Sequence, residues 1–74
     1  MASRFYLIQT TPTGYKSKED FLTEEEENYK NEATAIDDLK AIVAFARQRG
    51  FDGRSWELYR RGWFKDTFVV KMST

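Results

Sequence analysis

The stretch NEATAIDDLKAIVAFARQRGFDG, residues 31–53, decides the fold because it contains the clearest helix signal of the chain. Its apolar side chains recur at spacings of three and four residues, so they line one face of a helix for about four turns. These side chains are Ile36, Leu39, Ile42, Val43 and Ala46. The pattern predicts an amphipathic helix from Ala35 to Arg49.

Residue types that start and stop helices stand at both ends of this stretch. Thr34 is suited to cap the N-terminus, with Asp37 three residues later as its capping-box partner. Gly50 supplies the left-handed residue that ends many helices. Phe51 follows it directly and is placed to fold back on Ala46.

The segment RFYLIQT, residues 4–10, has the aromatic and aliphatic composition of a β-strand. Phe5 and Leu7 alternate with Tyr6 and Ile8, so both faces of this strand are apolar. A strand of this kind is usually covered on both faces or central in its sheet. We therefore expect it to be covered on both faces or to lie in the middle of the sheet.

The segment SWELYRRGWFKD, residues 55–66, predicts a β-hairpin with a three-residue loop, Arg60–Gly62, and glycine in the left-handed position. In this register Tyr59 faces Trp63, and Leu58 faces Phe64. A two-residue turn at Arg61 and Gly62 would mix apolar and polar side chains on each face, so the longer loop is preferred.

The preferred register separates the hairpin side chains into a core face and an outer face. The core face holds Trp56, Leu58, Phe64, Phe68, Val70 and Met72, and the outer face holds Glu57, Tyr59, Trp63 and Lys65. Asp66 falls on the core face, and a β-bulge near Lys65 would rotate it outward.

Residues 13–33 are compatible with a strand, a short helix or a mobile loop. Thr23 followed by Glu26 is a second capping-box pattern, whereas FLTEE (21–25) or NYKNEA (28–33) would suit an edge strand. An edge strand or an irregular segment is preferred because β-(β)-α-β-β fits a helix on one face of a small sheet. The predicted fold is one α+β domain over residues 1–74, with three or four antiparallel strands and one amphipathic helix packed on one face.

The composition limits the possible functions. The chain has 74 residues, no histidine and no cysteine, so the most versatile catalytic groups and the softer metal ligands are missing. A cleft for paired carboxylates is not expected in so short a chain. We therefore expect no enzyme activity, no cofactor and no metal site.

The same composition indicates where the protein resides. No apolar run approaches the ~20 residues that cross a bilayer, and the N-terminus lacks a signal peptide's apolar stretch. Small secreted domains usually contain disulfides, which this chain cannot form. We expect a cytoplasmic protein with no membrane contact.

The net charge is zero, but the two halves differ. Residues 1–40 carry five Lys/Arg against nine Asp/Glu, a net charge of −4, and residues 41–74 carry seven against three, a net charge of +4. The acidic run Glu24, Glu25, Glu26 and Glu27 is most simply a solvated segment, and it lacks the spacing of a calcium loop. A sharper hypothesis is that this run, with Glu19, Asp20, Glu32, Asp37 and Asp38, imitates a nucleic-acid backbone for a basic partner.

The outer face of the hairpin is the better candidate for binding. Its predicted partner-binding residues are Tyr59, Arg60, Arg61, Trp63 and Lys65, which include the types enriched at binding hot spots and in single-stranded nucleic-acid sites. The competing interpretation is structural, with Trp63 covering a sheet edge or packing against Tyr15 or Tyr29.

In size, layout and lack of catalytic groups the chain resembles small phage-encoded inhibitors, anti-CRISPR proteins among them, although no motif carries this resemblance. The first hypothesis is a non-enzymatic protein that binds, and modulates or inhibits, a larger protein or protein complex. The alternative is a weak single-stranded nucleic-acid-binding module. A third is a homodimer paired through a strand edge or the aromatic face.

Overall fold

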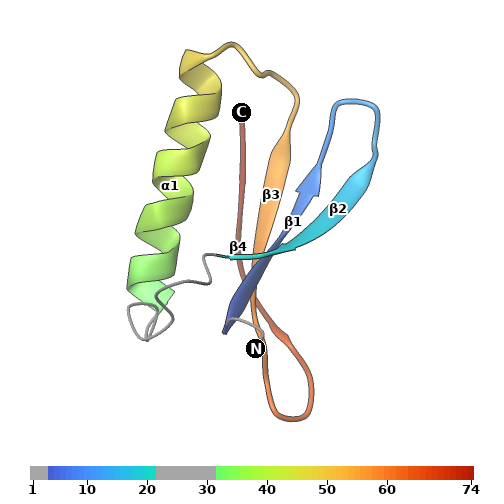
Figure 1. The fold of residues 1–74 in the computed structure, drawn as a ribbon, viewed down its shortest axis with the longest axis vertical. Helices are drawn as coiled ribbons and strands as arrows, with labels where there is room; N and C mark the ends of the chain where they lie inside the picture. Colours follow the sequence, from blue (N-terminus) through green and yellow to red (C-terminus); the bar gives the residue numbers. More distant parts are fainter. Residues whose placement is uncertain (1–3, 22–31) are drawn as a thin grey trace.

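The computed structural model describes residues 4–21 and 32–74. They form one antiparallel sheet in the strand order β2-β1-β3-β4, with one helix, α1, between β2 and β3 in the chain (Figure 1). The elements are β1 (Phe5–Thr10), β2 (Lys16–Asp20), α1 (Glu32–Gln48), β3 (Ser55–Arg60) and β4 (Thr67–Ser73). The predicted α+β class is confirmed, as is the central position of the first strand.

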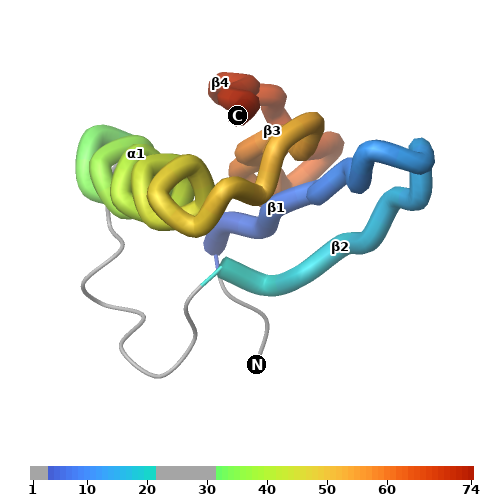
Figure 2. Tube along the Cα trace, turned by 90° about the horizontal axis from the view of Figure 1, so that it is seen from above, coloured from blue at the N-terminus to red at the C-terminus, as the bar shows by residue number. Residues whose placement is uncertain are grey.

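The helix lies against one face of the sheet (Figure 2). Side chains from both layers form the hydrophobic core between them. Leu39, Val43 and Ala46 from the helix meet Leu7 and Leu58 from the two central strands. Leu39 and Leu58 have no exposed surface. Burying an aliphatic side chain of this size stabilises the fold by about 1.5–3 kcal/mol.

The helix begins earlier than the sequence predicts. It starts at Glu32, so Thr34 lies inside the first turn and the prediction of Thr34 as N-cap is wrong. Glu32 and Ala33 are good helix formers, and a glutamate in the first turn is favoured by the helix dipole. These two residues extend the helix on the N-terminal side of Thr34.

The helix ends at Gln48, one residue before the predicted Arg49, and Gly50 stops it as predicted. Gly50 has φ of +78°, its N–H donates to the Arg47 carbonyl at 3.0 Å, and the Phe51 N–H donates to the Ala46 carbonyl at 2.9 Å. These two hydrogen bonds define a Schellman motif, which satisfies carbonyl groups that the helix itself leaves without partners. The chain then turns back toward the sheet to begin β3.

The hairpin of β3 and β4 exists, but its predicted register is wrong. Leu58 pairs with Val70, not with Phe64, and Tyr59 pairs with Phe68, not with Trp63. The loop between the strands therefore spans residues 61–66 instead of the predicted Arg60–Gly62. The observed pairing places Val70 and Met72 against the core cluster.

The observed register changes which hairpin side chains belong to the core. Trp56, Leu58, Val70 and Met72 lie on the helix side as predicted, because the observed register differs from the predicted one by an even number of residues. A bulge opposite Tyr59, not near Lys65 as predicted, turns Phe68 to the other face. Phe64 and Phe68 are therefore exposed, not buried.

The predicted edge strand is confirmed, but it lies earlier in the chain than FLTEE or NYKNEA. It is β2, and Phe21, one residue after its end, is buried in the core. Glu32 and Ala33 of NYKNEA belong to the helix. The capping pair of Thr23 and Glu26, the rest of both segments and the acidic run at 24–27 lie outside the described residues.

In the described part of the chain, α1 is the only helix, and it is neither long nor apolar enough to cross a membrane.

Replacing Gly50 by alanine should reduce the free energy of unfolding by about 1 kcal/mol, because a Cβ disfavours the left-handed conformation. No atom lies within 4 Å of the added Cβ, so the effect is conformational and not a clash. Gly50→Asn is the matched control and should cost less, since asparagine tolerates this conformation. Urea unfolding of the three proteins measures the difference; equal stability of all three would contradict the assignment of Gly50 as the helix stop.

Candidate interaction surface

The sheet face opposite α1 carries a row of three aromatic side chains across β1, β3 and β4. The rings of Tyr6 and Tyr59 are stacked, with centroids 5.2 Å apart and planes 7° apart, and Phe68 meets Tyr59 edge-on at 5.6 Å. No described helix covers this face. Tyr6 is buried in this row, whereas Phe68 at its end is exposed. Ring pairs of this kind stabilise by about 0.5–1.5 kcal/mol beyond the area they bury.

Tyr6 is the centre of this face. Only 5% of its surface is exposed, yet it does not belong to the core cluster under the helix. Tyr59 stacks on it from β3, while the ammonium group of Lys18 lies 4.4 Å and the guanidinium of Arg61 4.8 Å from the ring centroid. Cations over an aromatic ring are attracted to its electron-rich face. Tyr6 is thus covered by its neighbours instead of by a second layer of secondary structure.

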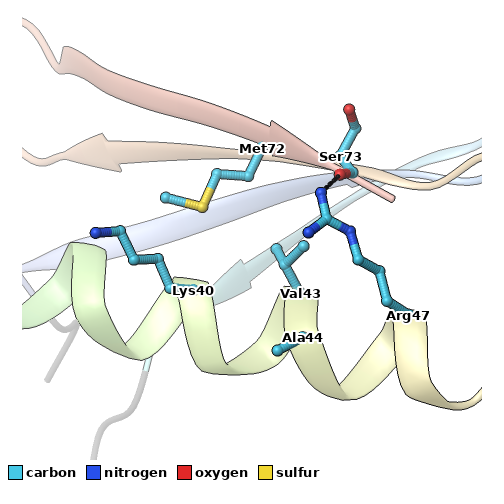
Figure 3. A pocket seen from close by; sticks show the side chains of 6 residues that line it. All are labelled: Lys40, Val43, Ala44, Arg47, Met72 and Ser73. Atoms are coloured by element: carbon cyan, nitrogen blue, oxygen red, sulfur yellow. Dashed lines mark hydrogen bonds between the residues drawn. The ribbon is translucent and has the colours of Figure 1, made fainter.

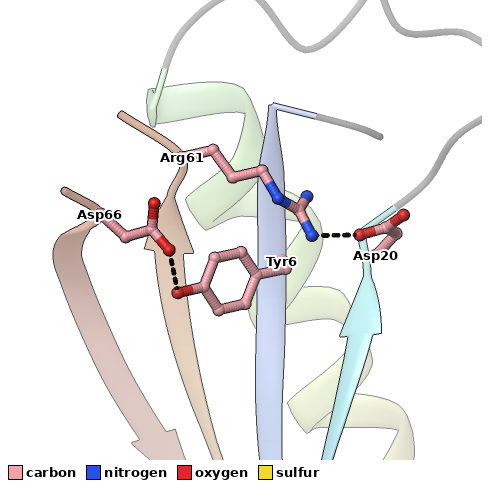
Figure 4. A network of polar contacts seen from close by, with 4 residues as sticks. All are labelled: Tyr6, Asp20, Arg61 and Asp66. Carbon is pink, nitrogen blue, oxygen red and sulfur yellow. Dashed lines mark hydrogen bonds and ion pairs between the residues drawn. The ribbon is translucent and has the colours of Figure 1, made fainter. Parts of the chain in front are cut away.

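The Tyr6 hydroxyl connects this central strand to the loop between β3 and β4. It donates a hydrogen bond of 2.7 Å to Oδ2 of Asp66, the last residue of that loop (Figure 4). The other carboxylate oxygen of Asp66, Oδ1, accepts a hydrogen bond of 3.2 Å from the N–H of Gly62. One carboxylate therefore holds both ends of the loop.

Two further contacts fix the start of the loop. The Arg61 N–H donates to the carbonyl oxygen of Arg4 at 2.8 Å, and the Arg61 guanidinium pairs with Asp20 at 2.7 Å (Figure 4). The loop also turns tightly, because a Cβ on Gly62 would lie 2.0 Å from the Lys65 carbonyl oxygen. Any side chain at position 62 would force this turn to open.

This anchored loop presents two aromatic side chains to solvent. Trp63 is 99% exposed and Phe64 is 85% exposed. Their ring centroids are 6.5 Å apart, with the planes tilted by 32°. We call Trp63, Phe64 and Lys65 the loop tip. The structural interpretation of Trp63 as a residue packed against Tyr15 is wrong, since Trp63 has almost no covered surface, and Tyr29 lies outside the described residues.

The five predicted partner-binding residues have different surroundings. Tyr59 packs in the aromatic row, Arg60 forms an ion pair with Glu32 at the start of α1, and Arg61 pairs with Asp20. Only Trp63 and Lys65 belong to the loop tip, and the predicted pairing of Tyr59 with Trp63 does not exist. The arginines thus hold the loop and the helix to the sheet.

Sequence reasoning missed Phe64, Tyr6 and Asp66 as parts of this surface. Phe64 was assigned to the core by the incorrect register, and Tyr6 lies far from the loop in the sequence. Asp66 did give a signal, because it was the one charged residue that the predicted hairpin placed in the core. A carboxylate that a predicted register places among apolar core residues indicates that it has a hydrogen-bond partner in another part of the fold. For Asp66 this partner is the Tyr6 hydroxyl.

The hydrogen bond changes the acidity of both partners. Burial of the phenol raises the pKa of Tyr6 to about 12, and the hydrogen bond to Asp66 adds to this effect. The same hydrogen bond, followed by the one from the Gly62 N–H, lowers the pKa of the Asp66 carboxyl below its usual value. Asp66 is therefore ionised at neutral pH and accepts both hydrogen bonds.

Residues 4–21 and 32–74 contain no group of three acidic side chains close enough to hold a metal ion. The acidic run Glu24, Glu25, Glu26 and Glu27, proposed as a mimic surface, lies outside these ranges. Two members of its wider set, Asp20 and Glu32, are already paired with arginines.

Comparisons with protein-family models, with curated protein sequences and with solved structures returned no match.

Removing the Tyr6 hydroxyl should weaken the loop anchor and change how stability depends on pH. Folded Tyr6 keeps its proton up to about pH 12, whereas an unfolded tyrosine loses it near pH 10. The free energy of unfolding of the wild type should therefore fall between pH 10 and pH 12 by an amount that Tyr6→Phe lacks. At neutral pH the variant should also be less stable, with faster exchange of the Gly62 amide proton.

Urea unfolding at pH 7, 10 and 11.5 measures this difference, with Tyr15→Phe as the control because Tyr15 is 69% exposed. Parallel pH profiles of the wild type and Tyr6→Phe would contradict the anchoring role of the hydroxyl.

Proposed function

We propose that the protein is a non-enzymatic interaction protein that binds a larger protein or protein complex through the loop tip. The observation that carries this proposal is the pair of almost fully exposed aromatic side chains on a loop that is anchored at both ends. Monomeric proteins seldom leave adjacent large aromatic residues in water without a use. Tryptophan is also among the residue types enriched at binding hot spots.

The anchoring favours binding energetically. Burying Trp63 and Phe64 in a partner would contribute about 3–6 kcal/mol before the costs of association. A loop that is already held by Asp66 and Arg61 loses little conformational freedom when it binds, so less of this gain is offset. Lys65 makes no ion pair among the described residues, and it would favour an acidic group beside the partner's apolar pocket.

Modulation or inhibition of the partner, as by a phage- or mobile-element-encoded inhibitor acting in the cytoplasm, is the form of this function that we favour. A small protein that presents exposed aromatic side chains on a loop can inhibit a larger protein complex by occupying one of its sites, without catalytic activity. The missing histidine and cysteine support a role without catalysis.

Single-stranded nucleic-acid binding is the alternative function. Trp63 and Phe64 could stack on bases, and Lys65 could contact phosphate. The contacts support this alternative less well, since Tyr59 is stacked on Tyr6 and both arginines are paired with carboxylates. Such binding should weaken steeply as salt concentration rises, whereas an aromatic-centred protein interface should weaken little.

The double variant Trp63→Ala/Phe64→Ala should lose partner binding by at least about 30-fold, the loss typical of hot-spot residues. Its free energy of unfolding should stay within about 0.5 kcal/mol of the wild type, because neither side chain packs against the fold. Tyr15→Ala is the matched control, since it removes an aromatic side chain that is 69% exposed in the loop between β1 and β2.

The measurement is a nuclease-treated pull-down from host lysate with the three proteins, followed by titration of the captured protein at two salt concentrations. Capture by the wild type and Tyr15→Ala but not by the double variant is the expected result. Equal capture by all three would remove the loop tip as the interface. Capture by the wild type that appears only in a parallel pull-down without nuclease would favour the nucleic-acid alternative.

A further inference from the structure

The two edges of the sheet differ in how they are protected against pairing with another strand. The β2 edge has the sequence KSKED, in which four of five residues are charged. The β4 edge has the sequence TFVVKMS, in which only Lys71 is charged, and β4 is the longest strand of the sheet. Charged side chains are a common protection of sheet edges, so β4 is the edge more open to strand addition.

The hydrogen-bond pattern shows which backbone groups of β4 face outward. The Thr74 N–H donates to the Arg54 carbonyl at 2.9 Å, and hydrogen-bonded pairs in an antiparallel ladder recur at every second residue. Met72 and Val70 therefore direct their N–H and C=O groups toward β3. Lys71 and Ser73 direct theirs away from β3, to the side where no described strand lies.

The outer carbonyl of Ser73 is already used. It accepts a hydrogen bond of 3.0 Å from the guanidinium of Arg47 in α1 (Figure 3). This contact confirms that the Ser73 carbonyl points away from β3. The row of outward-facing backbone groups that a further strand could use therefore ends at Ser73. Lys71 is the centre of that row.

A groove of about 380 Å³ lies beside this edge, between α1 and β4. Its apolar lining comes from Val43, Ala44 and Met72, and two cations, Lys40 and Arg47, stand at its rim (Figure 3). Lys40 makes no ion pair among the described residues, and Arg47 retains donors beyond the one that contacts Ser73. The groove is thus apolar at its base and positively charged at its rim.

We propose that the β4 edge and this groove form a strand-addition site for an extended segment of a partner protein that carries acidic and apolar residues. The segment pairs with the backbone of Lys71, which is the usual source of affinity in strand addition, and places alternate side chains in the groove. An apolar side chain contacts Met72 and Val43. A neighbouring Asp or Glu contacts Lys40 and Arg47.

The charges favour such a partner over a second copy of the chain. Antiparallel pairing of two β4 strands about a two-fold axis perpendicular to the sheet would place the helices of both copies on the same side of the extended sheet. The cations at the rim of one groove would then face those of the other, and like charges at close range oppose association. This site involves none of the loop-tip residues, so its test does not depend on whether the loop tip binds a partner.

The test begins with selection of random-sequence 12-residue peptides displayed on phage, with the immobilised full-length protein as bait. Selected peptides are synthesised and titrated by fluorescence anisotropy. We expect them to alternate β-branched residues with other residues and to contain at least one Asp or Glu. In the complex, the Lys71 amide proton should exchange more slowly with solvent than in the free protein.

Two variants of Lys71 separate the backbone from the side chain. Lys71→Pro removes the outward N–H without removing a hydrogen bond to β3, and should weaken binding by about tenfold or more. Lys71→Thr keeps the N–H and should bind within about twofold of the wild type. Lys40→Glu should weaken the acidic peptides and favour versions with Lys in place of the acid. If Lys71→Pro is unfolded by circular dichroism, the exchange rate of the Lys71 amide decides alone.

Several results would overturn the proposal. The first two are a selection that enriches no peptide, and peptides that bind folded Lys71→Pro as tightly as the wild type. The others are a Lys71 amide proton whose exchange with solvent is not slowed by the peptide, and peptide binding that is lost in Trp63→Ala/Phe64→Ala. A dimer of the wild type in light scattering that is absent in Lys71→Pro would also overturn it, because a second copy would then occupy the edge. Peptide binding that is retained in the Trp63→Ala/Phe64→Ala protein shows that the β4 site binds without the loop tip, so the two proposals are tested separately.

Discussion

The hydrogen bond from the Tyr6 hydroxyl to Asp66 joins the central strand of the sheet to the loop that carries the most exposed aromatic residues. Because α1 covers only one face of the sheet, Tyr6 on the other face depends on Tyr59, Lys18 and Arg61 for cover. That cover keeps the phenol largely out of water, so its hydroxyl has to find a partner within the protein. Asp66 is that partner, and through its second oxygen it also holds Gly62. The shape of the loop follows from the packing of the sheet.

The charged residues near this loop are used mainly inside the protein. Arg60 links β3 to the first residue of α1, and Arg61 links the loop to β2. Each of these pairs joins an acidic residue of the first half of the sequence to a basic residue of the second half, so part of the uneven charge distribution is neutralised within the fold. The cations that remain without ion pairs in the described part of the chain include Lys65 at the loop tip and Lys40 at the groove beside β4. They stand beside exposed apolar surface, where a partner would meet both features together.

The helix and the order of helix and strands along the chain could be predicted because their signals are local or depend on a strong pattern. Leu39, Val43 and Gly50 mark the buried face and the end of the helix within a few turns. The register of the hairpin could not be predicted, because registers that differ by an even number of residues keep the same faces for Leu58 and Val70. The choice between them depends on the bulge opposite Tyr59 and on the contact of Asp66 with Tyr6, which is distant in the sequence. Trp63 and Lys65 were binding candidates from the sequence, which left open whether Trp63 is exposed, whereas Phe64 became a candidate only once the register was known.

The central claim is that the loop tip is held in place before any partner binds. Backbone ¹⁵N relaxation of the free protein tests it directly, by comparing order parameters of residues 62–66 with those of β1 and β3. Values near 0.85, as in rigid backbone, are expected, with loss of order in Tyr6→Phe at the same residues. Values below about 0.6 in the wild type would show that Trp63 and Phe64 move freely on a flexible loop, and would contradict the account.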